Sequence, residues 1–290
     1  IRGLVQLPYG AFSGATVQTN LLHLEKGNKE TMDAFPLVSS RGKRRDISYE
    51  KVLEDPDFAL RLCHPRMGEL WKICREKGTP LGEIAACHEG VHTGNVRHLL
   101  FTKNPRDRNA LPMLKGADLK PFSTHFNGRY IRYDAALIDK KKGQYASLRK
   151  RENFLSPKLV CRQTADRLIV ARETEGYITD NSVHTIRTRN PEKWKDSWLL
   201  LYLNSSVATM LYRFQSGEEG RPLPQIKLVF LRKLPVPVWS CSVESIESLV
   251  KSAEDEARRE GVLSEKTQER IDSLVWGSFQ LCREEWELKE

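Results

Sequence analysis

Several features that would assign a function directly are missing from the sequence. Its longest apolar stretches, such as residues 198–203, fall far short of the roughly 18 residues that a membrane-spanning helix needs. The six cysteines form no CxxC pair and follow no regular spacing, which argues against a disulfide framework and is typical of a reducing compartment. The chain also starts without a methionine or a signal region. We therefore expect a cytoplasmic part of a longer protein, with no membrane contact.

Established catalytic motifs are missing as well. The sequence contains no Walker loop, HExxH, GxSxG or zinc-type cysteine and histidine spacing. Cys87, His88 and His92 are close in sequence, but we expect them on alternating faces at a strand end, with too few ligands for a metal. Asp118 and Lys120 have the spacing of half of a nuclease site, and no convincing first carboxylate precedes them. We expect no metal site.

The positive charge is concentrated in the middle of the chain. The 47 Lys and Arg exceed the 38 Asp and Glu by nine over 290 residues. Residues 91–175 hold 18 basic and 8 acidic side chains, a balance of +10, whereas residues 242–290 hold 7 and 13, a balance of −6. A basic middle favours a polyanionic partner, for which nucleic acid is the default. The alternative is a solvated basic face without a partner.

The first part of the chain predicts a short hairpin and two helices. At about 150 residues per domain, the length suggests two domains. Two apolar runs separated by a glycine-containing loop are typical of the edge strands of a larger sheet. Residues 28–56 are polar and are expected to form a connector. The expected strands are 3–8 and 19–24, and the expected helices are 49–53 and 65–77.

The rest predicts short strands followed by helices. From about residue 81 to 184, β-type runs alternate with turn signals, and the last three are expected to pair as antiparallel hairpins. Asn190-Pro191 is expected to open one long helix that holds Trp194, Trp198 and Tyr212 in the core. The expected strands are 97–102, 128–133, 158–163, 167–172 and 177–178, and amphipathic tail helices are expected at 242–260 and 264–289.

Six groups of segments stand out as motifs. The most distinctive is the pair KLVCRQTADR and YITDNSVHTI, at residues 158–167 and 177–186. The other segments are LPYGAFSGATVQTNLL at 7–22, GVHTGN at 90–95, LKGAD at 114–118 with YIRYD at 130–134, LNS at 203–205 with PQIK at 224–227 and LPVP at 234–237, and IDSLV at 271–275. Together and in this order, they resemble the back half of a bacterial adenine-specific (N6) DNA methyltransferase of the restriction-modification type, with its TaqI-like target-recognition domain.

The resemblance implies an α+β fold. A mainly antiparallel β target-recognition domain with packed helices follows the last hairpin of an α/β methyltransferase sheet and precedes a helical tail. The implied divisions are the catalytic-domain edge at 1–45, a connector with a helix at 46–78, the DNA target-recognition domain at 79–240 and the helical tail at 241–290.

The implied chemistry is methyl transfer from S-adenosylmethionine to adenine N6, after the base is flipped out of the duplex. The Asn-Pro-Pro-Tyr motif and the glycine-rich cofactor loop of that family do not occur in these residues. We therefore expect this chain to bind no cofactor and to be inactive alone, so that whether it is called an enzyme depends on its parent. The expected partners are double-stranded DNA and an N-terminal catalytic domain, and the chain is expected to be monomeric.

A specificity or interaction subunit that stands alone and docks on a separate methyltransferase or nuclease chain is the alternative. The opening hairpin separates the two hypotheses, because such a subunit has no reason to carry the edge of a catalytic sheet. An Asn-Pro-Pro-Tyr motif within about 150 residues upstream, the usual size of that domain, would also favour the methyltransferase.

Phe12 matches the position of the aromatic residue that stacks on the flipped base in this family. Its neighbours Gly10, Ser13 and Gly14 favour an exposed loop. Stacking on a planar ring would recover part of the cost of unstacking the base. The alternative is that Phe12 is an ordinary core residue at a strand end.

The candidate DNA-binding residues fall into two groups. Thr93, Gly94 and Asn95 form a tight loop whose polar groups are candidates for a groove, with glycine permitting close backbone approach. Arg162 and Gln163 suit guanine and adenine edges respectively. An ion pair of Arg162 with Asp166 or Asp180 is the equally weighted alternative. The remaining candidates, read mainly as phosphate contacts that do not read sequence, are Arg97, Lys115, Lys120, Arg129 and Arg167.

The side chains that read bases are expected elsewhere. Motif residues shared across different targets cannot all specify sequence, so the basic loops 104–109 and 140–151 are the better candidates for direct readout. Asn181 and His184 are expected to hydrogen-bond within the fold.

Overall fold

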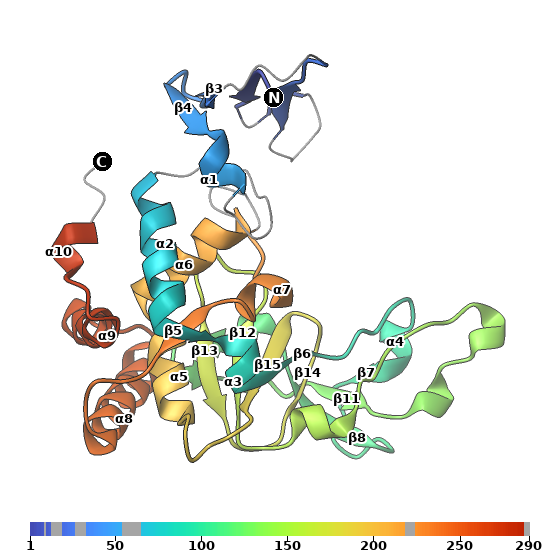
Figure 1. Ribbon diagram of the computed structural model, residues 1–290. Helices are drawn as coiled ribbons and strands as arrows, with labels where there is room; N and C mark the ends of the chain where they lie inside the picture. Colours follow the sequence, from blue (N-terminus) through green and yellow to red (C-terminus); the bar gives the residue numbers. More distant parts are fainter. Residues whose placement is uncertain (9, 13–18, 27–32, 54–64, 218–223, 287–290) are drawn as a thin grey trace. The chain divides into compact units, whose positions relative to one another are not determined.

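The computed structural model describes residues 1–8, 10–12, 19–26, 33–53, 65–217 and 224–286 (Figure 1). The chain separates into two compact units. The first holds the described residues up to Leu53, and the second holds those from Pro65 onward. The connector predicted over 46–78 is therefore divided, with one of its helices in each unit.

The first unit is a four-stranded sheet with a helix against it. Leu4, Phe35 and Leu37 form its small core. The strand order is β2-β1-β3-β4, with β1 antiparallel to β2 and parallel to β3. The predicted opening hairpin is confirmed by the pairing of β1 with β2. The elements are β1 (Gly3–Gln6), β2 (Asn20–His23), β3 (Ala34–Val38), β4 (Arg44–Ser48) and α1 (Tyr49–Leu53).

The prediction of a polar connector over 28–56 is wrong for residues 34–48, which form the antiparallel hairpin β3–β4. Phe35 and Leu37 alternate with less buried residues, as a half-buried strand requires. The partner strand was missed because Ile47 is its single apolar residue, so that the hairpin carries no hydrophobic signal in its second half.

The second unit is built on a central sheet of order β13-β12-β15-β6, in which all neighbours are antiparallel. Alternation along β12 divides its side chains between two cores: Leu159 and Cys161 lie in the helical core, and Val160 lies in the core on the opposite face. The strands are β6 (Ala85–Glu89), β12 (Lys158–Arg162), β13 (Val170–Glu173) and β15 (Val183–Thr188).

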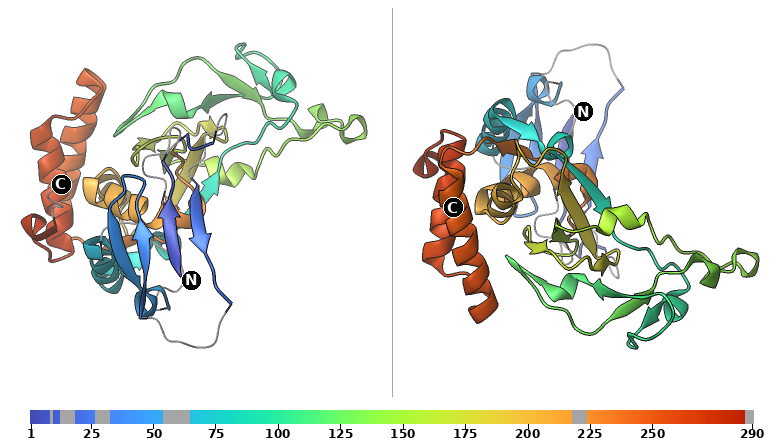
Figure 2. Two further views of the ribbon diagram at one scale, coloured as in Figure 1. Left: turned by 90° about the horizontal axis from the view of Figure 1, so that it is seen from above. Right: turned by 90° about the horizontal axis from the view of Figure 1, so that it is seen from below.

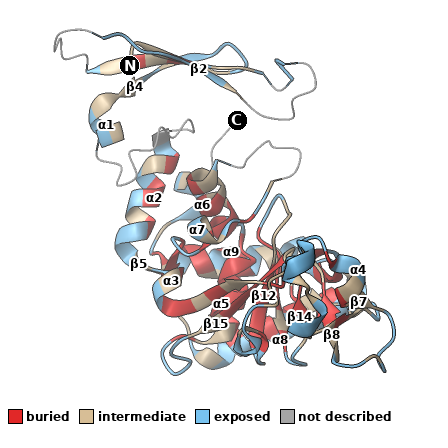
Figure 3. Ribbon diagram, turned by 90° about the vertical axis from the view of Figure 1, so that its right-hand side faces the viewer, coloured by how far each residue is buried: buried red, intermediate tan, exposed pale blue. Residues whose placement is uncertain are grey.

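Helices from both ends of the second unit share one core. Residues 197–203 of α5 are buried without interruption (Figure 3), and Trp198 and Tyr212, like Trp194, are core residues as predicted. The tail, predicted as a separate region, packs into this same core through residues of α8 and α9. The helices are α2 (Pro65–Lys77), α3 (Leu81–Ile84), α4 (Arg97–Leu100), α5 (Asp196–Leu203), α6 (Ser206–Ser216), α7 (Leu228–Leu231), α8 (Val243–Glu260), α9 (Glu265–Ser278) and α10 (Arg283–Trp286).

A second sheet, of order β14-β8-β11-β7, packs against the central sheet through the core that contains Val160. Met113 and Leu114, neighbours on β8, contribute to different cores on its two faces. Its strands are β7 (Phe101–Thr102), β8 (Ala110–Leu114), β11 (Tyr130–Arg132) and β14 (Ile178–Thr179). Two small ladders complete the unit, namely β5 (Gly78–Pro80) with β16 (Pro235–Pro237) and β9 (Leu119–Lys120) with β10 (Ser123–Thr124).

Two strand predictions are wrong in this region. Residues 97–102 form the turn of helix α4 followed by the two-residue strand β7. The hairpin of β12 with β13 is confirmed, but β14 does not continue it and instead pairs in parallel with β8 of the other sheet. A run of two residues is too short to specify its partner, so the pairing depends on the burial of Ile178 with Met113 and Ile131 of the second sheet.

The helix predicted from Asn190 onward begins instead at Asp196 and is interrupted after Leu203. The Asn204 side chain bonds both the backbone nitrogen and the carbonyl of Val170, at 3.0 and 2.9 Å. The Ser205 hydroxyl then accepts from the Ala208 backbone and caps α6. A mid-helix pair of polar residues thus ends one helix, starts the next and ties both to β13.

Asp272 joins the tail to the start of α6. Its two carboxylate oxygens accept from the backbone nitrogen and the hydroxyl of Ser206, each at 2.8 Å, and one accepts from Gln268 at 3.1 Å. The carboxylate is 5% exposed and lies at the positive end of a helix dipole. It is therefore a stabilising contact between α9 and α6.

We expect Asp272→Ala to lower the free energy of unfolding by about 2 kcal/mol, because it removes the buried carboxylate that accepts from both Ser206 donors. Urea unfolding followed by circular dichroism measures the change. Glu269→Ala removes an exposed carboxylate from the same helix, and its free energy of unfolding should stay within about 0.5 kcal/mol of the wild-type value. Equal losses in the two variants would contradict the assignment.

Candidate nucleic-acid interface

Three cations gather where α4 meets the second sheet. Two of them lie over the ring of Phe101, with the guanidinium carbon of Arg97 at 4.9 Å and the ammonium of Lys115 at 4.7 Å from its centroid. Burial lowers the pKa of Lys115, and the positive charges of Arg97 and Arg129 lower it further. We call Arg97, Lys115 and Arg129 the basic cluster. Because these charges repel one another, an anion bound beside them would be stabilised.

Asp118 holds this cluster in shape. Its carboxylate accepts from the Lys115 backbone nitrogen at 2.8 Å and from Asn127 at 2.6 Å, and it forms an ion pair with Arg129 at 2.7 Å. The side chain is fully buried, at the end of a 3-10 turn over Gly116–Asp118. Asp118 is therefore a structural carboxylate whose oxygens are committed to protein donors, and Arg129 is anchored by it. This organising role was missed in the sequence, where the LKGAD segment was its signal.

Arg162 lies beside the same turn. A Cβ built on Gly116 would be 3.4 Å from Cγ of Arg162. The alternative of an ion pair with Asp166 or Asp180 is wrong: within the described parts of the chain neither pair forms, and the Asp180 carboxylate instead accepts from Ser182. Arg162 as a residue is half-buried.

Gln163 and Arg167 follow on the turn after β12. The backbone of Gln163 is tied on both sides, donating to Ser182 at 2.8 Å and accepting from Ile226 at 2.6 Å. Its side chain is half-buried, and Arg167 is exposed. The strand end that carries Arg162 and Gln163 is therefore rigid. His184 bonds the Ile226 carbonyl at 2.7 Å, which confirms its predicted role within the fold.

The loop 93–95 is used inside the protein. Gly94 has a φ of +49°, and a Cβ there would lie 2.0 Å from the carbonyl oxygen of Tyr145. Asn95 accepts from the backbone nitrogen of Tyr145 at 2.9 Å and donates to the carbonyl of Gly143 at 3.0 Å. The close approach that requires glycine is thus made to another loop of the chain. Thr93 is half-buried beside it.

Lys120 lies apart from the basic cluster in its contacts. Its ammonium is 2.6 Å from the place a Cβ on Gly261 would occupy. Gly261 caps the carboxyl end of α8, where the helix dipole favours a positive charge. Lys120 thus faces the acidic tail.

The two basic loops differ in how they are held. In the first, Asp107 accepts from the Thr102 hydroxyl at 2.6 Å and from Asn104 at 2.7 Å, and pairs with Arg132. In the second, Arg149 pairs with Glu89. Both loops present exposed cations to solvent; these are Arg106, Arg108, Lys140, Lys141, Lys142, Lys150 and Arg151.

Phe12 lies between β1 and β2 and is 54% exposed. The alternative that it is an ordinary core residue is therefore wrong. Ser13 and Gly14 lie outside the described residues.

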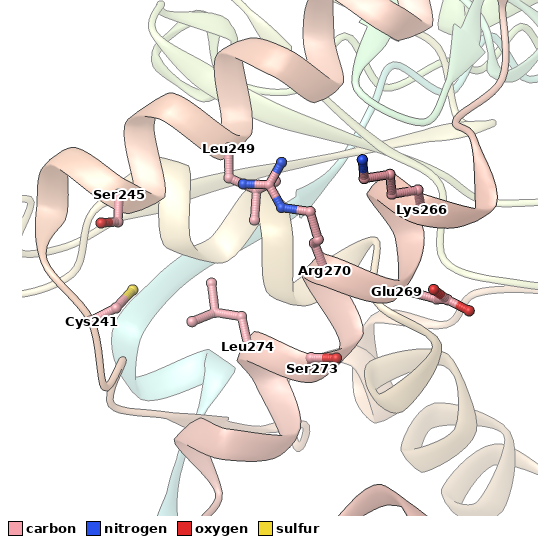
Figure 4. Close-up of a pocket in the computed structure, with 8 residues that line it drawn as sticks. All are labelled: Cys241, Ser245, Leu249, Lys266, Glu269, Arg270, Ser273 and Leu274. Carbon is pink, nitrogen blue, oxygen red and sulfur yellow. The ribbon is translucent and has the colours of Figure 1, made fainter.

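Other candidate sites are weaker. A groove of about 450 Å³ between α8 and α9 has Leu249 and Leu274 facing each other across it, with Cys241 and Ser245 at one end (Figure 4). It holds none of the predicted DNA-binding residues. Cys87 is buried and His88 is partly exposed, which confirms their alternation on β6. Among the described residues no cluster of three potential metal ligands occurs, and no helix in those ranges is both long and apolar enough to cross a membrane.

Comparison with known proteins finds a family that part of this chain resembles. Residues 111–236 match the TaqI-like C-terminal specificity domain. A putative type II restriction enzyme and methyltransferase of Methanocaldococcus jannaschii is 23% identical over 320 residues, which cover 96% of this chain and 25% of that protein. The chain thus spans about a quarter of the length of this relative.

Solved structures resemble the chain over nearly its full length. The type IIL restriction-modification enzyme MmeI, in complex with DNA, has a TM-score of 0.50 at 8% identity, covering 97% of this chain and 43% of that one. The type IIG restriction endonuclease BpuSI has a TM-score of 0.45 at 13% identity, covering 99% and 44%. The fold likeness to MmeI confirms the predicted α+β class. The segment 111–236 of this chain is thus similar to the TaqI-like C-terminal specificity domain family.

Proposed function

We propose that the chain is the DNA target-recognition part of a site-specific adenine-N6 methyltransferase of a restriction-modification system. One observation carries the proposal: the segment that matches the specificity-domain family also contributes Lys115, Arg129 and Arg162, which surround the turn held by Asp118. The restriction and methylation activities in the names of its relatives agree with it.

DNA recognition is proposed to use two kinds of contact, one to backbone phosphates and one to base edges. Arg97 and Lys115 neutralise backbone phosphates, since cations that repel each other gain most from a polyanion. Arg162 and Gln163 reach base edges from the rigid end of β12, and the basic loops 104–109 and 140–151 supply further contacts in the grooves. Positioning and readout are thereby assigned to different side chains.

Methylation of N6 requires the adenine to leave the stack, and Phe12 is the proposed stacking partner. Its 54% exposure leaves the ring accessible to a base. The family's S-adenosylmethionine motifs do not occur in these residues, so this chain supplies recognition and stacking only and is expected to methylate nothing alone.

A specificity subunit that docks on a separate catalytic chain is the competing proposal. The first unit argues against it, because β1–β4 form a sheet with its own small core of Leu4, Phe35 and Leu37 and with β1 parallel to β3. A recognition subunit alone has no need of such a sheet. We therefore favour the methyltransferase.

Lys115→Ala should weaken binding to mixed-sequence duplex DNA and reduce the slope of log K against log salt by about 0.9, the value for one phosphate contact. Fluorescence anisotropy titrations at salt concentrations from about 50 to about 200 mM measure this slope. Lys120→Ala removes the same charge from the same segment but beside Gly261, and should leave the slope unchanged. Identical slopes for both variants would contradict the assignment of Lys115.

Arg162→Lys should retain binding to mixed-sequence DNA and lose preference for the target, because an ammonium cannot make the bidentate contact of a guanidinium. The loss should be about 1–3 kcal/mol at one base pair. Competition between target and scrambled duplexes measures it. If preference survives, Arg162 does not read a base.

Phe12→Ala in the full-length enzyme should slow methylation more than it weakens DNA binding, because stacking stabilises the flipped state and not the encounter. Sequencing of methylated adenines in DNA from cells that express the enzyme identifies the target duplex. Single-turnover methylation and binding are then compared on that duplex. Equal losses in rate and affinity would count against stacking.

A further inference from the structure

Tyr145 is a large aromatic side chain that is 65% exposed, more than Phe12. It lies in residues 138–151, which we call the arm. The arm extends away from β8 and β11, and is yellow-green in both views of Figure 2. An exposed tyrosine indicates a binding site only when the loop that carries it is held in place. The contacts of the arm hold Tyr145 in this way.

The GVHTGN segment clamps the arm at Tyr145. Asn95 binds the backbone on both sides of Gln144, through the Gly143 carbonyl and the Tyr145 nitrogen. Gly94 lies directly under the ring: a Cβ there would be 2.6 Å from Cδ2 and 2.7 Å from Cε2 of Tyr145. One face of the segment is thus shaped to receive this residue.

Further bonds fix the arm on either side of the ring. His92 and Ser147 exchange two backbone hydrogen bonds, at 2.9 and 2.7 Å. The Asp139 backbone donates to the Gln144 side chain at 2.9 Å, and the Gln144 backbone donates back to the Asp139 carbonyl at 3.2 Å. These contacts hold the backbone at Tyr145 in one place, while the Tyr145 side chain is exposed to solvent.

The charge around the ring indicates what it binds. Lys140, Lys141 and Lys142 form a 3-10 turn three residues before it, and all three are exposed. Asp139 caps that turn, and its ion pair with Lys142 at 3.7 Å leaves the other two lysines for a partner. A fixed, exposed aromatic ring beside several cations suits nucleic acid, because bases stack on the ring while phosphates meet the ammonium groups.

We propose that Tyr145 stacks on a nucleobase at an opened step of the target DNA, and that the GVHTGN segment positions this ring. The inference rests on the proposed function, since it assumes a DNA target. It assigns Gly94 and Asn95 a positioning role through Tyr145, in place of direct groove contacts.

The test uses the whole chain and a pool of duplexes with a randomised centre. The wild-type chain first enriches the pool, and affinities for the enriched pool are then measured for Tyr145→Phe and Tyr145→Ala. We expect Tyr145→Phe to bind like wild type and Tyr145→Ala to bind about tenfold more weakly, the usual effect of removing one stacked ring. The salt slope should stay unchanged in both, because neither removes a charge.

Gly94→Ala is the positioning variant, expected to lose affinity as Tyr145→Ala does, with no further loss when the two are combined. Thermal unfolding of each variant checks that it is folded. Wild-type affinity in Tyr145→Ala overturns the proposal, and so does an equal loss in Tyr145→Phe, since that would indicate a hydroxyl contact. If the wild-type chain enriches no sequence, the proposed target recognition itself fails, and this inference falls with it.

Discussion

The second unit depends on the two-sided burial of β12. Leu159 and Cys161 face the helices and Val160 faces the other sheet, so one strand carries two cores at once. Because side chains alternate with a period of two, any shift of register by one residue would exchange these faces. The strand is paired on both edges, with β13 and β15, which excludes such a shift. Arg162 and Gln163, the side chains proposed to reach base edges, lie at the end of this strand.

The fold of the second unit brings basic residues that are distant in sequence close together. Lys115 and Arg129 are fourteen positions apart in sequence, and they come together because both bind the buried carboxylate of Asp118. Arg162 joins them from β12 across Gly116, where a side chain would intervene. A single acidic residue in a region of net positive charge thus orders the cations around it. Lys120, only five residues beyond Lys115, is directed instead to the tail.

Gly94 and Asn95 of the GVHTGN segment illustrate how a motif can position another residue, which then contacts the ligand. The sequence pattern favours direct contact of Gly94 with DNA, because glycine permits close backbone approach. The close approach exists, but its partner is Tyr145. A motif of this kind shapes a loop, and the loop presents the side chain that meets the ligand.

Several local features follow from sequence alone. The bounds of α2, the opening hairpin, the pairing of β12 with β13 and the burial of Trp198 were all predictable, because each depends on neighbouring residues or on periodicity. The family resemblance rested on ordered motifs of the same local kind. The hairpin β3–β4 escaped because its second strand is polar and gains its burial from Phe35 and Leu37 opposite.

Only the tertiary structure decided which distant segments contact each other. Three sets of contacts join residues that are 50 to 66 positions apart: the parallel pairing of β14 with β8, the hydrogen bonds of Asp272 that join the tail to α6, and the clamp on Tyr145. No local propensity encodes such contacts, since each depends on which buried surface or unpaired donor is nearby once the chain has collapsed. The sequence by itself therefore determined the fold class and the number of cations in the middle of the chain. Only the folded chain decided which of these cations lie together and which side chain the GVHTGN segment positions.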